Sequence, residues 1–141
     1  MAVADLDGDG RLDLVIANNR AAPTFYLNRL ESTGASLRLD LVGSAQSGRD
    51  AIGAEARLTL EAPAGGRART LTRWVEAGSG YASQSELTLH FGLGAHGRPV
   101  RLEILWPSGL EESYSGSELE AMVAARGPSR IEEGGAAILR P

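Results

Sequence analysis

The feature that most constrains the fold is an alternation of apolar and polar residues in several short segments. In the first, three leucines are separated by Arg38 and Asp40. Successive side chains of a strand point to opposite faces, so this pattern is typical of strands with one buried face. The expected buried positions are Leu37, Leu39 and Leu41; Ala54, Ala56, Leu58 and Leu60; Leu87, Leu89, Phe91 and Leu93; and Val100, Leu102, Ile104 and Trp106. Glycine-rich turns between such segments predict an all-β fold, an antiparallel β-sandwich or barrel-like domain.

Turn-forming residues punctuate these segments. Pro63 to Gly66 predicts a hairpin turn, after which residues 67–76 form the return strand. The segment Trp106 to Gly109 has proline and glycine at the second and fourth positions of a type I turn. Further strands are therefore expected on both sides of these two turns.

The division of the chain follows from its polar breaks. The segment Glu31 to Gly34 is the expected boundary. We predict a first unit with short strands over residues 1–33, a β domain over 34–116 and a C-terminal tail over 117–141. Within the tail, 117–126 is expected to form a short helix, because its apolar residues recur at helical spacing.

Four aspartates crowd into one glycine-rich loop near the N-terminus, at Asp5, Asp7, Asp9 and Asp13. Carboxylates this close repel one another unless a cation lies among them. Ca²⁺ takes six to eight oxygen ligands and suits such a flexible loop. We predict a Ca²⁺ site to which the aspartates supply carboxylates and Arg11 its backbone carbonyl. A metal-free turn stays open, because Asp and Gly both favour turns.

Composition excludes several classes of function. The 141 residues carry 14 basic and 18 acidic side chains, for a net charge of −4, and contain no cysteine. Disulfides and thiolate metal sites are therefore excluded. The scattered basic residues argue against a nucleic-acid partner, and no apolar run approaches the length of a membrane span. Neither a secretion signal nor a nucleophile-elbow or phosphate-loop motif is visible, so we expect no enzyme.

Two stretches resemble known families. Residues from about Ala2 to Asn28 resemble the last blade of an FG-GAP/VCBS-type β-propeller, whose Ca²⁺ loops read D-x-D-G-D-G-x-x-D. Residues from about Gly48 to Ser115 resemble an ASPIC/UnbV domain, which follows such propellers in secreted proteins. The matching motifs are DAIGA at 50–54, GSGYASQS at 78–85, LHFGLG at 89–94 and LWPSG at 105–109. The resemblance implies an extracellular, periplasmic or cell-surface location.

The first of these resemblances implies that residues 1–33 are a partial β-propeller blade, a single one. A propeller needs typically 4–8 blades to close. We therefore expect the chain to be attached to upstream propeller blades, with docking of its leading strands elsewhere as the alternative.

The loop from Gly78 to Ser85 is a second candidate site. Its residues Tyr81, Ser83 and Gln84 could meet a ligand or partner, since polar loops often carry function. An Ω-like loop whose side chains satisfy its own backbone is the structural alternative.

The sequence predicts structural or solvated positions for the tryptophans and histidines. Trp74 and Trp106 are expected in the core, with stacking on a sugar as the alternative. His90 alternates with apolar neighbours, so we expect it exposed on the face opposite the core. His96 lies in a glycine-rich turn and is expected to be solvated.

Three functions follow from these observations. The leading one is a non-catalytic, Ca²⁺-stabilised extracellular module for binding or adhesion, with an unknown protein or glycan partner. A carbohydrate-binding module using Tyr81, Trp74 or Trp106 is the second. An accessory domain of a secreted enzyme is the third.

Overall fold

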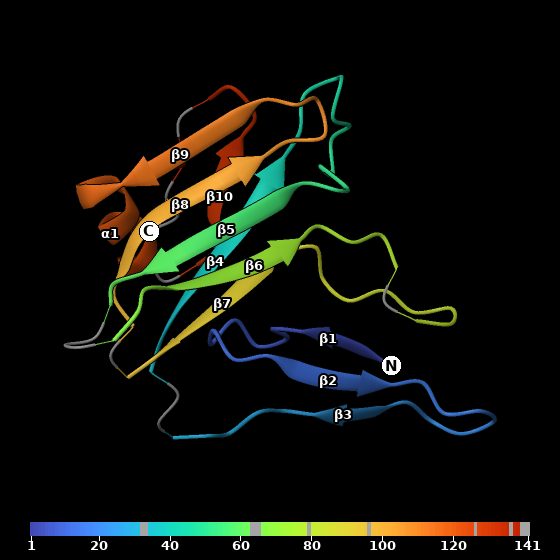
Figure 1. Cartoon of the computed structure of the whole chain (residues 1–141). Helices are drawn as coiled ribbons and strands as arrows, with labels where there is room; N and C mark the ends of the chain where they lie inside the picture. Colours follow the sequence, from blue (N-terminus) through green and yellow to red (C-terminus); the bar gives the residue numbers. More distant parts are fainter. Residues whose placement is uncertain are drawn as a thin grey trace.

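The computed structural model describes residues 1–31, 34–62, 66–78, 80–95, 97–125, 127–135 and 137–138. The N-terminal unit, residues 1–31, holds an antiparallel sheet in the order β1-β2-β3. Its strands are β1 (Ala2–Ala4), β2 (Asp13–Ile16) and β3 (Thr24–Tyr26). Figure 1 draws this unit in blue, below β6 and β7.

The rest of the described chain, here called the β domain, contains two four-stranded sheets, β11-β10-β4-β7 and β6-β5-β8-β9. Their strands are β4 (Ala35–Val42), β5 (Glu55–Leu60), β6 (Arg69–Trp74), β7 (Leu89–Gly94), β8 (Pro99–Leu105), β9 (Glu111–Ser115), β10 (Ser129–Glu132) and β11 (Ala137–Ile138). A single apolar cluster joins the inner faces of both sheets. The expected all-β, sandwich-like fold is confirmed.

The alternation in the sequence correctly identified most of the core. Leu37, Leu39, Phe91, Leu58 and Leu102 are fully buried between the sheets. The core positions that the sequence identified and the structure buries also include Leu41, Ala54, Ala56, Leu60, Leu89, Leu93, Ile104 and Trp106. Burial of such side chains is the main favourable contribution to folding. Val100 is a wrong assignment: it lies near the start of β8 and stays 41% exposed.

The C-terminal segment is more structured than the predicted tail. The expected helix is present as α1 (Gly116–Ala124), which buries Leu119 and Met122 and contacts β4, β8 and β9. Beyond it, β10 pairs with β4 in parallel and β11 pairs with β10. The sheets are therefore not wholly antiparallel as predicted. The helix carries the chain back across the sandwich, which brings β10 to the free side of β4 in the same direction (Figure 1).

Several predicted features fall on residues outside those the structure describes. These are part of the boundary at 31–34, most of the hairpin turn at 63–66, one residue of the 78–85 loop, His96 and the last position of the expected helix, 126. The type I turn at Trp106 to Gly109 is described, and the Gly109 N–H donates to the Trp106 carbonyl at 2.9 Å. Among the described residues, no helix is both long and apolar enough to cross a membrane.

Glu133 links loops at one end of the β domain through hydrogen bonds. Its carboxylate accepts hydrogen bonds from the Ser44 backbone N–H at 2.6 Å, the Ser47 hydroxyl at 2.9 Å and the Ser108 hydroxyl. Burial alone would raise the pKa of Glu133, but these hydrogen bonds outweigh it and lower the pKa to about 2. The ionised carboxylate therefore favours the folded chain.

We expect Glu133→Gln to destabilise the chain at neutral pH and to matter less as the pH falls. The pKa of Glu133 is lower in the folded chain than its ordinary value of 4.5, so the ionised side chain stabilises the fold fully above about pH 4.5. That stabilisation is lost as the pH falls through about 2. Thermal unfolding of wild type and variant across this range checks it. The difference in Tm should close toward low pH, and a difference that does not change with pH would contradict the account.

Candidate functional site

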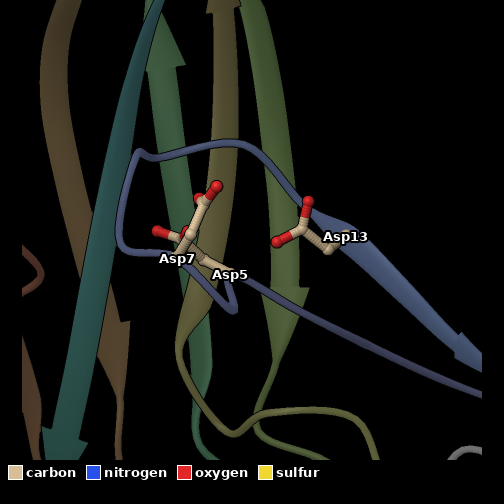
Figure 2. A group of neighbouring side chains, drawn as sticks. All are labelled: Asp5, Asp7 and Asp13. Carbon is tan, nitrogen blue, oxygen red and sulfur yellow. The ribbon is translucent and has the colours of Figure 1, made fainter. Parts of the chain in front are cut away.

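The loop between β1 and β2 brings three of its aspartates together. One carboxylate oxygen each from Asp5, Asp7 and Asp13 lies within 4.8 Å of the others. Figure 2 shows Asp5 and Asp7 on the loop facing Asp13 at the start of β2. The loop can close this tightly because Gly8 and Gly10 adopt positive φ angles of 75° and 89°, which cost glycine little.

Asp13 is buried and holds the unit together. Its two carboxylate oxygens accept hydrogen bonds from the Leu6 N–H at 2.9 Å and the Asn28 N–H at 2.7 Å. The hydrogen bond from Asn28, and then that from Leu6, lowers the pKa of the Asp13 carboxyl below its usual value. One ionised side chain thus links the start of the loop to the segment after β3.

Asp5 is the second buried carboxylate. It accepts the N–H groups of Asp9 at 3.1 Å and Gly10 at 2.9 Å, and it forms an ion pair with Arg38 of β4. The side chains of Asp5 and Arg38 are only 5% and 10% exposed. Asp7, by contrast, lies nearer the surface, where Arg29 pairs with it at 3.1 Å.

Asp9 and Arg11 are placed differently from the other predicted ligands. The Asp9 carboxylate lies outside the three-carboxylate group. It accepts the Arg11 N–H at 2.9 Å and pairs with the Arg11 guanidinium. Arg11 also donates from Nε to the Asn28 carbonyl at 2.7 Å. A metal role for Asp9 and for the Arg11 carbonyl therefore stays a prediction.

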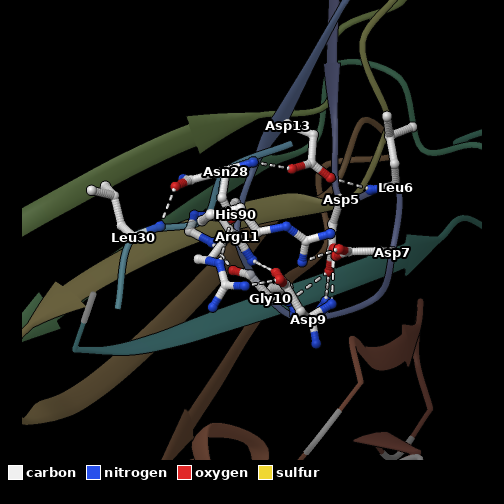
Figure 3. A network of polar contacts seen from close by, with 12 residues as sticks. Asp5, Leu6, Asp7, Asp9, Gly10, Arg11, Asp13, Asn28, Leu30 and His90 are labelled. Carbon is white, nitrogen blue, oxygen red and sulfur yellow. Dashed lines mark hydrogen bonds and ion pairs between the residues drawn. The ribbon is translucent and has the colours of Figure 1, made fainter. Parts of the chain in front are cut away.

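Two residues that are neighbours on adjacent strands of the β domain contact this loop. Arg38 of β4 and His90 of β7 are register partners on the outer face of the sheet. His90 Nε2 lies 3.0 Å from the Gly10 carbonyl oxygen, and because a carbonyl only accepts, Nε2 carries the hydrogen. Figure 3 shows Asp5, Gly10 and His90 within one network of polar contacts. His90 does point away from the core, but it is half-buried rather than exposed, because the N-terminal unit covers it.

A second contact lies beside β1. The Val3 N–H donates to the Ser85 hydroxyl at 3.2 Å, and the Glu86 N–H donates to the Val3 carbonyl at 3.1 Å. Burial is the main cause that raises the pKa of Glu86, while a hydrogen bond from the Asp5 N–H opposes it. Its Oε1 is buried without a hydrogen-bond partner among the described residues. The contacts between the two units at this point are thus polar.

The donor set of the loop fits a hard divalent cation. Asp5, Asp7 and Asp13 offer carboxylate oxygens, the ligands that Ca²⁺ prefers. Each carboxylate oxygen has two lone pairs, so an oxygen that accepts one hydrogen bond can still coordinate a metal. Asp5 and Asp13 are already oriented by backbone N–H groups. The residues that would hold a Ca²⁺ ion are these three, in the loop that the sequence indicated.

Residues 80–83 of the second candidate loop form a tight turn on the surface. Gly80 and Ser83 form an isolated antiparallel bridge, and Ala82 adopts a positive φ of 49°. Tyr81 is fully exposed at the tip. The bridge supports the structural interpretation, and a ligand role for Tyr81, Ser83 and Gln84 stays a prediction.

The two tryptophans differ. Trp106 is 1% exposed and lies in the core, as expected. Trp74 is 52% exposed, so its assignment to the core is wrong. It ends the edge strand β6, where Leu71 is the inward residue and even-numbered positions face outward. The strand period already placed Trp74 on the outer face, and the general preference of tryptophan for cores obscured this.

The functional residues that the sequence did not indicate are those that contact the loop from other parts of the chain. The sequence shows Arg38 only as a polar position between two leucines. It contains no motif that would indicate a role for Asn28 or Glu86. The alternation showed that Arg38 and His90 share the outer face of the sheet. Nothing in a single sequence shows what lies against that face.

Comparison with known proteins places both parts of the chain. Residues 1–35 match the FG-GAP repeat, and residues 43–128 match the family described as ASPIC and UnbV. Cartilage acidic protein 1 of Mus musculus is 28% identical over 124 residues, which are 86% of this chain and 18% of that protein. Cartilage acidic protein 1 of Xenopus tropicalis is 30% identical over 109 residues, 77% of this chain and 16% of that protein.

This chain therefore spans less than a fifth of the length of these relatives. The family match covers more than half of the chain, including α1 as well as the strands from β5 to β9. The chain belongs to the ASPIC and UnbV family and carries an FG-GAP repeat at its N-terminal end.

Proposed function

We propose that the chain is a non-catalytic, Ca²⁺-stabilised module for extracellular binding or adhesion. The observation that carries this proposal is the group of three carboxylates, Asp5, Asp7 and Asp13, whose oxygens lie within 4.8 Å of one another. The group lies in a loop that two residues of the β domain contact directly. Binding of an ion there would act on both parts of the chain.

The bound ion would act through charge. Ca²⁺ would neutralise the carboxylates, with Asp9 and the Arg11 carbonyl as the further predicted ligands, and would fix the strands on both sides of the loop. An ion that binds the folded chain and not the unfolded chain adds its binding free energy to stability. Loops of this kind in extracellular modules bind Ca²⁺ with dissociation constants of about 0.1–1 mM, which suits a location outside the cytosol.

The place of the module in a longer protein is part of the proposal. The matched residues span less than a fifth of each relative, and the FG-GAP repeat is one unit of a repeated architecture. The N-terminal unit would join upstream propeller blades, and the β domain would present the surface for a protein or glycan partner.

Isothermal titration of the chain with Ca²⁺ tests the proposal, with Mg²⁺ as the comparison cation. Wild type should bind one Ca²⁺. Asp7→Ala should abolish binding without loosening the loop, because Asp7 supplies a carboxylate but accepts no backbone N–H from the described residues. Asp50→Ala removes the same charge from an exposed position outside the loop and should bind as wild type does. Absence of Ca²⁺ binding in all three proteins would refute the metal site.

A carbohydrate-binding module is the second candidate, favoured by the exposed indole of Trp74. This ring borders a groove of about 280 Å³. The polar side chains that line the same groove include Arg73, Glu76, Glu86 and His90. An aromatic face beside hydrogen-bonding groups suits a sugar ring. A glycan array checks it with wild type and Trp74→Ala, and binding that survives the substitution would exclude this surface.

A further inference from the structure

Arg38 stands out because it brings a full positive charge from the β domain into the acidic loop of the N-terminal unit. It pairs with Asp5, and both side chains are largely shielded from water. The two residues are 33 positions apart in sequence. Shielding from solvent strengthens such a charge pair relative to the pairs at the surface.

Both oxygens of the Asp5 carboxylate accept hydrogen bonds in this arrangement. Its Oδ2 accepts both the Gly10 N–H and the Arg38 guanidinium, and its Oδ1 accepts the Asp9 N–H. Arg38 is therefore a cation already in contact with one of the three converging carboxylates.

The position of Arg38 is fixed by the sheet rather than by the loop. It pairs in register with His90, whose ring holds the Gly10 carbonyl 3.0 Å away, and Leu37 and Leu39 on either side are fully buried in the core. The guanidinium cannot move far without either leaving Asp5 or shifting β4. A second cation on Asp5 would meet a charge that the fold holds in place.

We infer that Arg38 is a resident counter-ion that competes with Ca²⁺ for Asp5 and so sets a low affinity for the metal. The inference rests on the proposed Ca²⁺ binding and adds to it the residue that tunes the site. Arg38 keeps the loop folded and docked when Ca²⁺ is scarce, because it supplies part of the charge that the aspartates need. Ca²⁺ must then overcome that charge, so the site responds only to high concentrations.

Removal of the charge with the size of the side chain roughly kept should therefore tighten metal binding. We expect Arg38→Gln to bind Ca²⁺ about tenfold more tightly than wild type, and Arg38→Lys, which keeps the charge, to stay within about threefold of wild type. Arg29→Gln is the matched control, because Arg29 pairs with Asp7 in the same cluster but is 63% exposed. Solvent screens that pair, so its removal should change the affinity by less than about threefold.

Isothermal titration with Ca²⁺ alone, at one fixed ionic strength, measures these affinities in the full chain. If wild type binds Ca²⁺ and Arg38→Gln binds no more tightly, the inference is overturned while the proposed function stands. If no form of the chain binds Ca²⁺, the proposed function fails and the inference fails with it. The two failures are thus distinguishable.

A measurement on the wild type covers the case in which Arg38→Gln does not fold. Competition predicts that saturating Ca²⁺ moves the guanidinium ¹⁵N resonances of Arg38 toward those of a free arginine, while those of Arg57, which pairs with Glu55 in the other sheet, stay in place. Arg38 resonances that do not change on saturation would overturn the inference.

Discussion

Replacement of Trp106 by alanine is expected to lower the free energy of unfolding of the β domain by about 3–5 kcal/mol. Trp106 is the largest fully buried side chain of the described core. Its Nε1–H donates to the Glu112 carboxylate, so the substitution leaves both a cavity and a carboxylate without this donor. Urea unfolding followed by far-UV circular dichroism measures the loss.

Trp74→Ala provides the matched control for this prediction. The same side chain is removed from an exposed position at the end of the edge strand β6, so the cost should stay below about 1 kcal/mol. The chain has two tryptophans, so each variant keeps one: the buried indole remains in Trp74→Ala and the exposed indole in Trp106→Ala. Equal destabilisation by both substitutions would contradict the placement of the tryptophans.

Asp13→Ala is expected to unfold the N-terminal unit while the β domain stays folded. Asp13 is the shared acceptor for the Leu6 and Asn28 N–H groups, and its loss leaves both donors unpaired in a small three-stranded sheet. Partly buried donors without a partner are costly, and this sheet has little apolar core to offset the cost. Hydrogen exchange of wild type and variant, followed by NMR, measures the outcome residue by residue.

Asp9→Ala is the control for the loop. It removes the same charge four residues away, but Asp9 pairs with Arg11 near the surface rather than joining the unit together. Amides of β1, β2 and β3 should stay protected in this variant and lose protection in Asp13→Ala, while those of β5 and β8 stay protected in both. Loss of protection throughout the β domain in Asp13→Ala would show that the two parts fold as one.

The strands could be predicted from the sequence because each alternating segment carries its own periodicity. Each of four segments, around Leu37, Leu58, Phe91 and Leu102, has an apolar residue at every second position. This pattern predicts both the strand conformation and the face that is buried. The strand β10 could not be predicted in this way. Of its four residues, only Ile131 is large and apolar, and its burial comes from parallel pairing with the distant β4.

The same distinction applies to the candidate site. Four aspartates at short spacing indicate a cation from local sequence alone, and three of them do converge. The partners of the loop, Arg38 and His90, come from strands that are distant in sequence. Their roles depend on how the two parts of the chain pack together, and no local pattern records that packing.

Docking of the loop on β4 and β7 gives metal binding a consequence beyond the N-terminal unit. Asp5 is shared between the carboxylate cluster and Arg38, and Gly10 is shared between the loop and His90. Binding at the cluster would therefore influence how firmly the β domain is held. In a longer protein, this would link the FG-GAP repeat to the orientation of the domain that follows it.

Thermal unfolding in EGTA and in millimolar Ca²⁺, with wild type, Asp7→Ala and Asp50→Ala, tests the central claim most directly. Ca²⁺ is predicted to raise the Tm of wild type and Asp50→Ala by several degrees and to leave that of Asp7→Ala unchanged. No shift in wild type, or an equal shift in Asp7→Ala, would contradict a Ca²⁺ site in the loop between β1 and β2.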